Sequence, residues 1–300
     1  MIEIRVVTDL KQAASLWQEI SPRRVVFDDW NFRYGFFKLE PYPLCFRAAY
    51  EVSGDQKELV GLMPLVDYPE YGHGFIAEEP CEENRVFVKP GYDFVIKELY
   101  ESLNKKEKTQ FYDISGEDAY TKSLTLEDYK YVLPLAGFDS FSDFMSTRLS
   151  PKRRHSLEKE LQAVTDLKPV VVANDFADLD KLFELNVGSF VGESYLIKEE
   201  ERRPWRDLIK EPFNWQLTSL RINSKTVAVS LAVLYNGYWH YLITGVDFKT
   251  YPGLGKYLNM INIEKAIAAG ANYFDAGLGD CGWKNLWHFD QIPQYEYLNF

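Results

Sequence analysis

The chain of 300 residues is longer than a typical single domain, so two domains of about 150 residues are expected. It is 46% hydrophobic and 26% charged, a composition typical of a globular protein with a sizeable core. The net charge of −11 disfavours nonspecific binding to nucleic acid or anionic membranes, because such binding neutralises phosphates. Residues 1–150 hold 17 Lys and Arg against 26 Asp and Glu (−9), and residues 151–300 hold 17 against 19 (−2). The second half is therefore the better host for an anionic ligand.

The cysteines and histidines argue against two further classes, disulfide-rich proteins and metalloproteins with familiar ligand spacing. Cys45, Cys81 and Cys281 are an odd number without close spacing, which argues against a disulfide framework. The four histidines form no HxH or HxxxH pattern, and no CxxC occurs, so a metal site of familiar spacing is not expected. No apolar run reaches the roughly 18 residues that span a bilayer, and the N-terminus lacks the apolar block of a signal peptide. We expect a cytoplasmic protein that uses no metal.

The hydrophobic pattern predicts an α/β first half. In chain order it favours a short strand, helices over 10–20 and 28–39, strands near 44–52 and 59–66, a helix over 92–103 and a strand over 110–114.

The second half repeats this order. Helices are expected over 151–164, 176–190 and 199–209, strands over 216–222, 226–235 and 238–246, then a helix over 256–269 and a strand over 272–276. Asn223-Ser224 and Asn236-Gly237 are typical of tight hairpin turns between these strands.

The ends of the two series match in sequence. FYDISGED (Phe111–Asp118) stands 162 positions before YFDAGLGD (Tyr273–Asp280), and both contain two aromatic residues followed by Asp. This match, together with the same order of elements, indicates a tandem repeat of two α/β halves joined around 120–139. We predict domains over 1–130 and 131–300. The alternative is one large mixed α/β domain without internal symmetry.

A family resemblance rests on residues 236–289, which contain YLITGVD, YPGLGKYL, YFDAGLGD and GWK. This segment resembles the GNAT acyltransferase superfamily, in particular the tandem branch with Fem-type aminoacyl ligases and the acetyltransferases of exopolysaccharide or cellulose biosynthesis. The basic run Ser150-Pro151-Lys152-Arg153-Arg154 is similar to the start of the second half in this branch. The resemblance implies an α/β protein of two tandem GNAT-like domains, each a mixed, mostly antiparallel sheet flanked by helices.

The resemblance places an acyl-donor site in the second half. Glycines in the loop 251–256 allow close approach of a ligand, and the first N–H groups of the next helix would bind a pyrophosphate. The end of the preceding strand would separate from its neighbour and offer backbone groups to the amide arm of a donor and to a developing oxyanion. The predicted donor-binding residues are Ile243, Thr244, Gly245, Val246, Gly253, Leu254, Gly255 and Lys256. The alternatives are a helix-entry turn and an ordinary strand end with a bulge.

Three residues are candidates for the chemistry. Asp280 follows glycines on a loop and could accept a proton from an amine, provided that burial raises its pKa. Lys284 follows an aromatic residue, as in Fem-like sequences, and would stabilise a tetrahedral intermediate or hold an acidic substrate group. His240 lies on the strand before the donor site and could face either the cleft or the core. Ordinary ion-pair or core roles are the alternatives, and Cys281 is not expected to be a nucleophile.

Candidates on the acceptor side come from two segments. Glu193 and Tyr195 lie in a glycine-containing loop that covers the acceptor in many GNAT proteins. Arg153 and Arg154 belong to a basic run from Arg148 to Lys159, which would form one helical face if the segment is helical throughout. Such a face could bind a phosphate or carboxylate, and a solvated surface is the alternative.

The resemblance implies an N-acyltransferase that uses acetyl-CoA or another acyl-CoA and no metal. A primary amine of a small molecule or peptide would attack the thioester directly in a ternary complex. One alternative is a Fem-like ligase that uses aminoacyl-tRNA, which the acidic surface and the lack of a helical arm disfavour. Another is an inactive GNAT-fold binding module, because the phosphate loop is reduced to Thr250–Gly255.

Overall fold

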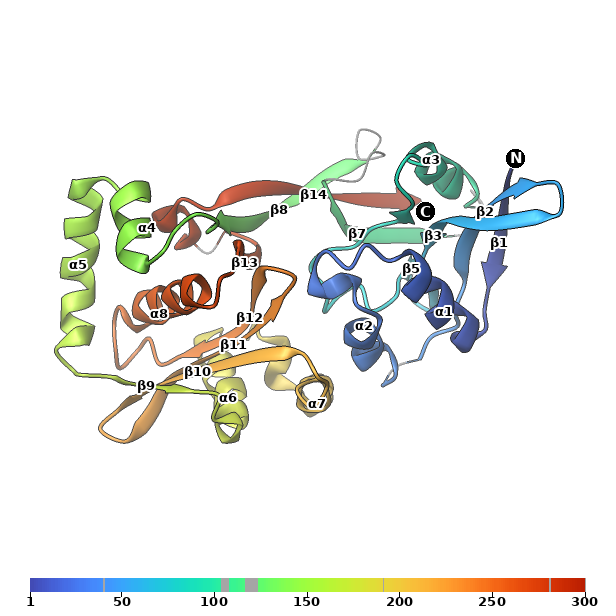
Figure 1. Cartoon of the computed structure of the whole chain (residues 1–300). Helices are drawn as coiled ribbons and strands as arrows, with labels where there is room; N and C mark the ends of the chain where they lie inside the picture. The colour runs from blue at the N-terminus through green and yellow to red at the C-terminus, as the bar shows by residue number, and fades with distance from the viewer. Residues whose placement is uncertain (40, 104–107, 117–123, 191, 281, 300) are drawn as a thin grey trace. The chain divides into compact units, whose positions relative to one another are not determined.

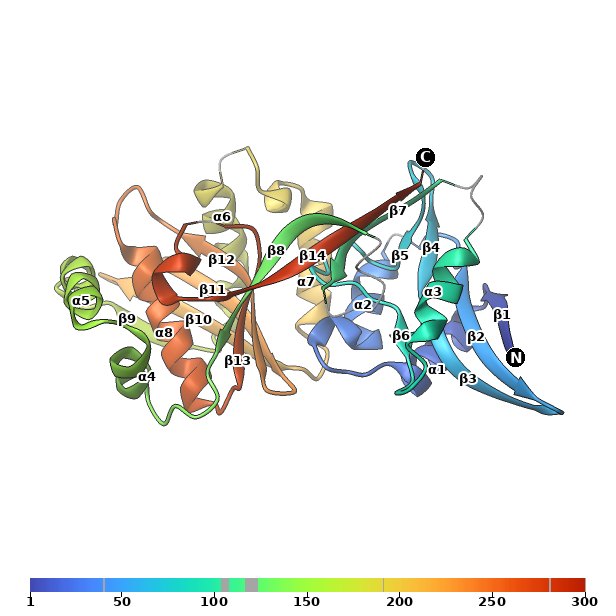
Figure 2. The ribbon, with the colours of Figure 1, turned by 90° about the horizontal axis from the view of Figure 1, so that it is seen from above.

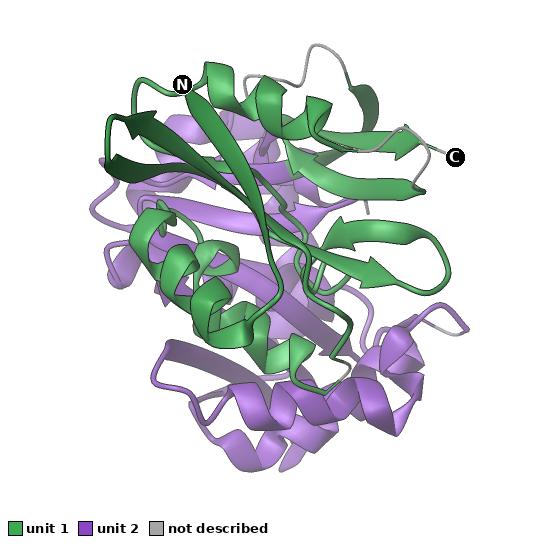
Figure 3. Ribbon diagram, turned by 90° about the vertical axis from the view of Figure 1, so that its right-hand side faces the viewer, with its two compact units in different colours: residues 1–130, 292–300 green, residues 131–291 purple. Residues whose placement is uncertain are grey.

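The computed structural model describes residues 1–39, 41–103, 108–116, 124–190, 192–280 and 282–299. The chain divides into two compact units, coloured separately in Figure 3: Met1–Lys130 with Ile292–Phe300, and Tyr131–Gln291. The first division falls after Lys130. The C-terminal strand folds with unit 1, although the predicted domain boundary assigned it to the second domain. No helix among the described residues has the length and apolar character needed to cross a membrane.

Unit 1 contains two groups of strands. Its elements are β1 (Ile2–Val7), α1 (Leu10–Ile20), η1 (Val26–Asp28), α2 (Trp30–Phe37), β2 (Phe46–Ser53), β3 (Gln56–Met63), β4 (Leu65–Tyr68), β5 (Gly72–Phe75), β6 (Phe87–Val88), α3 (Phe94–Glu101) and β7 (Thr109–Ser115). The strand orders are β1-β2-β3-β6 and β4-β5-β7-β14-β8. Strands β8 (Thr125–Pro134) and β14 (Asp290–Asn299) carry the chain from one unit to the other (Figure 2).

Helix α1 shows how the sequence builds this unit. The Asp9 carboxylate accepts the Gln12 N–H at 2.8 Å and so caps the first turn. Ala13, Trp17 and Ile20 fall on one face and are buried in a core shared with β2 and β3.

Unit 2 is a sheet with helices on both faces. Its elements are α4 (Phe141–Arg148), α5 (Pro151–Thr165), β9 (Val170–Ala173), η3 (Phe176–Asp178), α6 (Leu179–Ser189), η4 (Tyr195–Ile197), α7 (Glu199–Leu208), β10 (Asn214–Ile222), β11 (Lys225–Tyr235), β12 (Tyr238–Val246), α8 (Leu254–Ala268), β13 (Tyr273–Leu278) and η5 (Lys284–Trp287). The strand order is β8-β13-β12-β11-β10-β9. Strands β9 to β12 are antiparallel, and β13 is parallel to β12. Helix α8 covers one face and α6 the other (Figure 1).

Both predicted hairpin turns of this sheet are confirmed. Asn223 and Ser224 have φ of 49° and 65°, and Asn236 and Gly237 have φ of 47° and 81°. Two consecutive positive φ angles match the right-handed twist of the flanking strands. These turns fix the register of β10, β11 and β12.

The sequence pattern missed several elements. It predicted no β5, β6, β8, α4, β9 or β14, and β8 lies in the segment interpreted as the join between the halves. The predicted helix over 151–164 is present as α5, but the basic run from Arg148 to Lys159 is not helical throughout, because α4 ends at Arg148 and α5 begins at Pro151. The Ser150 hydroxyl accepts the Arg153 N–H at 3.3 Å and starts the new helix.

The repeat is visible in the topology. In unit 1, α3 precedes β7, which pairs in parallel with β5, and in unit 2, α8 precedes β13, which pairs in parallel with β12. The end of the first copy, residues 117 and 118, lies outside the described residues.

Candidate functional site

The strands β12 and β13 separate after a short ladder. Their parallel register joins Tyr238 to Tyr273 and ends with His240 opposite Asp275. Beyond this pair, β12 continues to Val246 while remaining paired with β11. We call the diverging segments, residues 241–246 of β12 and 276–278 of β13, the fork. Its position is the one at which strand separation was expected.

A bulge lies next to the fork. The β11–β12 register passes from Ala232 opposite Tyr241 to Leu231 opposite Ile243, so Leu242 has no opposite residue. An extra residue of this kind bends a strand and redirects its backbone groups.

A buried pair closes the apex of the fork. His240 Nδ1 lies 3.0 Å from Asp275 Oδ2, and both side chains are almost fully buried. The Asp275 carboxylate also accepts the Gly277 N–H at 3.0 Å. A carboxylate at this distance orients the imidazole ring and sets which nitrogen faces away. The histidine that sequence left open between cleft and core therefore lies in the interior, at the point where the strands part.

Side chains of α6 bind the β12 edge of the fork. Asn186 Nδ2 donates to the Thr244 carbonyl at 2.7 Å. Ser189 Oγ accepts the Val246 N–H at 3.0 Å and lies 2.8 Å from the Val246 carbonyl. Helix α6 approaches closely because Gly245 has no side chain: a Cβ there would lie 2.5 Å from the Leu182 carbonyl oxygen. The edge expected to be exposed is thus partly occupied by the chain itself.

Helix α5 covers the start of α8. Gly253, at φ 86°, takes the N-cap position of α8 without a side-chain cap. Lys256 Nζ contacts Glu160 Oε2 at 2.5 Å, and Glu160 also accepts bonds from Arg153 and Ser156. Lys256 holds the pKa of Glu160 at about 2, well below its ordinary value. The predicted phosphate-binding lysine is therefore paired with a carboxylate of its own chain.

The other predicted residues of the chemistry lie on the β13 side. Lys284 is buried and donates to the carbonyls of Gly277 and Leu278 at 3.0 and 2.6 Å. Asp280 is exposed, and its oxygens accept the Gly282 N–H and the Asn285 side-chain amide, both at 2.8 Å. Both residues thus shape the turn after β13.

The predicted acceptor-side residues are divided between two places. Glu193 and Tyr195 are exposed in the turn after α6. Arg154 donates to the Ser146 carbonyl at 2.8 Å and to the Leu149 carbonyl, which ties α5 to the end of α4. Arg153 contacts Glu160 at 3.1 Å. The two arginines therefore have partners on α4, on α5 and in the turn between these helices.

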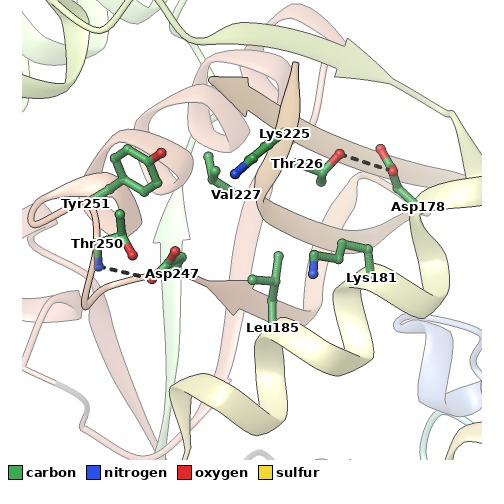
Figure 4. Close-up of a pocket in the computed structure, with 9 residues that line it drawn as sticks. All are labelled: Asp178, Lys181, Leu185, Lys225, Thr226, Val227, Asp247, Thr250 and Tyr251. Carbon is green, nitrogen blue, oxygen red and sulfur yellow. Dashed lines mark hydrogen bonds between the residues drawn. The ribbon is translucent and has the colours of Figure 1, made fainter. Parts of the chain in front are cut away.

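A cavity of about 550 Å³ opens beyond the end of β12 (Figure 4). It is lined by Asp178, Lys181, Leu185, Lys225, Thr226, Val227, Asp247, Thr250 and Tyr251. Its two lysines are balanced by two aspartates, so the lining has no net preference for an anion. Asp247 stands seven residues after His240, which corresponds to about 23 Å along a strand. The cavity is therefore remote from the apex of the fork.

The corresponding fork in unit 1 is filled. Strands β5 and β7 pair at His73 and Thr109, and polar side chains from the segment after β5 then occupy the edge of β7. Glu78 accepts the Tyr112 N–H at 2.7 Å, and Asn84 donates to the Tyr112 carbonyl at 2.9 Å. In the described part of unit 1, the backbone groups of Tyr112 on this edge are thus bonded to side chains of the same unit.

The described residues contain no group of three or more His, Cys, Asp and Glu side chains that could hold a metal ion. Cys45 and Cys81 form no disulfide, Cys45 Sγ lies 3.4 Å from His73 Nδ1, and Cys281 lies outside the described residues.

Comparisons with known proteins identify this architecture. Residues 151–285 match the family described as the acetyltransferase (GNAT) domain. The match covers 135 of the 300 residues, all of them in the second half. The whole chain aligns with FemX at TM-score 0.61 and 12% identity, covering 99% of this chain and 97% of that one. No curated protein sequence matches the chain significantly.

Two further solved structures confirm the tandem GNAT fold. L-PGS from Bacillus licheniformis aligns at TM-score 0.60 and 14% identity, over 96% of this chain and 91% of that one. A tandem GNAT protein from the clavulanic acid biosynthesis pathway aligns at TM-score 0.52 and 11% identity, over 100% and 99%. At these identities the likeness concerns the fold.

Sequence reasoning missed the side chains that contact the β12 edge of the fork and the start of α8. Asn186, Ser189 and Glu160 lie on helices far in sequence from β12 and α8. Asp275 was not among the predicted site residues, and its pairing with His240 depends on the parallel register. The one signal in the sequence was Gly245, whose missing side chain marks the close approach of α6.

Proposed function

We propose that this tandem GNAT protein transfers an acyl group from an acyl-CoA to a primary amine. The observation that carries the proposal is the fork of β12 and β13, with the bulge at Leu242 and the His240–Asp275 pair at its apex. A strand edge that leaves its neighbour offers backbone donors and acceptors to an extended arm and an N–H to a developing oxyanion.

The reaction would be direct attack in a ternary complex. The amine nitrogen forms a bond to the thioester carbonyl carbon, the carbon–sulfur bond breaks, and the amine proton leaves to an acceptor. His240 and Asp275 are buried, so in this proposal they hold the apex, whereas the exposed Asp280 or water takes the proton. The rate would then depend mainly on positioning.

An acyl-CoA donor can bind at the fork only by replacing contacts that the chain makes with itself. Its amide arm would pair with residues 243–246, and its diphosphate would approach Gly253 and Lys256. Because Lys256 contacts Glu160, and Asn186 and Ser189 bind the β12 edge, the donor has to replace these contacts.

The proposal is tested with acetyl-CoA and longer acyl-CoAs at millimolar concentration. Binding should raise the unfolding temperature, and amine acylation should release free CoA. Asp280→Asn should lower kcat about 100-fold with a smaller change in KM. Asp290→Asn, an exposed change at the start of β14, is the matched control. Absence of stabilisation by every acyl-CoA would contradict this donor.

A second candidate is aminoacyl transfer to an amine, as the Fem-like relatives suggest. The contact of Glu160 with Lys256 favours it, because a donor without a diphosphate does not need that lysine. The acidic surface argues against tight tRNA binding. Salt-dependent binding of charged tRNA, without binding of acyl-CoA, would select this candidate.

A further inference from the structure

We infer that Asn186 and Ser189 of α6 determine how well the fork accepts a donor whose arm carries amide groups. This inference rests on the proposed function. It concerns the edge of β12 that faces away from β11. None of the site residues predicted from the sequence lies on α6.

The direction of this edge follows from the backbone hydrogen bonds between β11 and β12. The Asp247 N–H donates to the Val227 carbonyl of β11 at 2.9 Å. Because backbone groups alternate in direction along a strand, those of Thr244 and Val246 point away from β11. These are the groups that a donor arm running along the fork would meet.

The α6 side chains present the hydrogen-bonding pattern of an amide arm. Asn186 supplies an amide N–H to the Thr244 carbonyl, and Ser189 Oγ accepts the Val246 N–H. Ser194 Oγ donates to Asn186 Oδ1 at 2.6 Å, which holds the carboxamide in this orientation. Ser189 Oγ lies 2.8 Å from both the Val246 and the Leu185 carbonyl, and its single proton serves one of them at a time.

A donor with amides in its arm therefore competes with the chain's own side chains. A donor of the same acyl group without amides does not need these backbone groups. Asn186 and Ser189 should thus weaken the binding of CoA-type donors and leave the binding of short, amide-free thioesters unaffected. This selection acts on the donor's arm and is independent of the acyl group.

The first test measures binding of CoA itself by calorimetry, without turnover. Ser189→Ala should bind CoA about 5- to 10-fold more tightly than the wild type, because the hydroxyl that competes for the Val246 backbone groups is removed. Asn186→Ala is the second variant and should change CoA affinity in the same direction. Ser146→Ala, which changes an exposed serine of α4, is the matched control and should leave the affinity unchanged.

The second test compares two thioesters as acyl donors. Ser189→Ala should raise kcat/KM for acetyl-CoA and leave it unchanged for S-acetyl-2-mercaptoethanol, whose arm has no amide. Unfolding curves of each variant establish that it is folded before binding is measured.

The outcomes separate this inference from the proposed function. Equal CoA affinity of wild type and both variants, or no CoA binding in any of them, would overturn the inference. If the variants bind CoA more tightly but none of the proteins acylates an amine, the inference stands and the proposed function fails.

Discussion

Asp113 and Asp275 occupy the same place in the two sequence repeats, yet their surroundings differ. Asp275 lies beside His240 and accepts a backbone N–H. Asp113 has φ of 52° and lies among acidic neighbours. Burial, and then the nearby Glu127, raise the pKa of Asp113 to about 7. A repeated residue type therefore does not guarantee a repeated role.

This pKa predicts a pH-dependent stability. The unfolded chain releases the Asp113 proton near pH 4, while the folded chain keeps it until about pH 7. The free energy of unfolding should therefore fall as pH rises through this window. Asp113→Asn should raise that free energy at pH 8 by up to about 4 kcal/mol and change it little at pH 4. Asparagine also tolerates the positive φ.

Urea unfolding at the two pH values measures this effect. Asp55→Asn, an exposed change in the turn between β2 and β3, serves as the control and should not alter the pH dependence. A variant at position 113 whose stability falls with pH as steeply as that of the wild type would contradict the prediction.

At the scale of elements, two helices fix the candidate site. Helix α6 reaches the β12 edge through side chains, and α5 reaches α8 through Glu160 and Lys256. Both contacts join segments that are far apart in sequence. The helices themselves were predictable from periodicity, whereas their docking depends on packing.

The docking of α6 requires the glycine at position 245. Gly245→Ala would bring a Cβ to 2.5 Å from the Leu182 carbonyl oxygen and 2.6 Å from the Asn186 nitrogen, so the helix has to move. We expect a loss of about 1–3 kcal/mol in the free energy of unfolding. Gly188→Ala in the same helix has open space and should stabilise the protein by about 1 kcal/mol. A neutral effect at 245 in urea unfolding would refute this account of the close approach.

The ion pair between Glu160 of α5 and Lys256 of α8 predicts that substitutions of the two residues change anion affinity in opposite directions. Glu160→Gln should leave Lys256 without its carboxylate and increase affinity for CoA about fivefold, whereas Lys256→Ala should decrease it. Glu158→Gln, an exposed change on the same helix, is the matched control. The comparison is made by calorimetry at two salt concentrations, because the gain from Glu160→Gln should shrink at higher salt. Equal affinities of the Glu160 and Glu158 variants would exclude this role of the ion pair.

At the scale of the whole molecule, the C-terminal strand completes unit 1. Strand β14 lies beside β7, with Tyr297 opposite Phe111 and packed against Tyr100. Gln294 is buried opposite Ser115. Unit 1 is therefore built from the beginning and the end of the chain.

A chain ending at Gln291 should lose the protease resistance of unit 1 and retain that of unit 2. Its β7 would have an unpaired edge and an exposed aromatic cluster. A peptide of residues 290–300 added in trans should restore part of the resistance, and a peptide with Tyr297→Ala should restore less. Full resistance of the truncated chain would show that β14 is dispensable.

The sequence by itself determined the local structure of this protein. Periodicity and turn residues predicted most helices and strands of unit 2, including β12 with both of its ends, and the repeat predicted two α/β halves. The tandem GNAT fold followed from the resemblance in residues 236–289 and is confirmed. Hydrogen bonding within hairpins and helices is local, so neighbouring residues suffice to specify it.

Only the tertiary structure decided the state of the fork. His240 meets Asp275 through a parallel register. Asn186, Ser189 and Glu160 contact partners that lie 57 to 96 positions away in the sequence. Strand β14 joins unit 1 from the opposite end of the sequence. These contacts depend on how elements pack in space, and the spacing of residues along the chain carries no record of that packing.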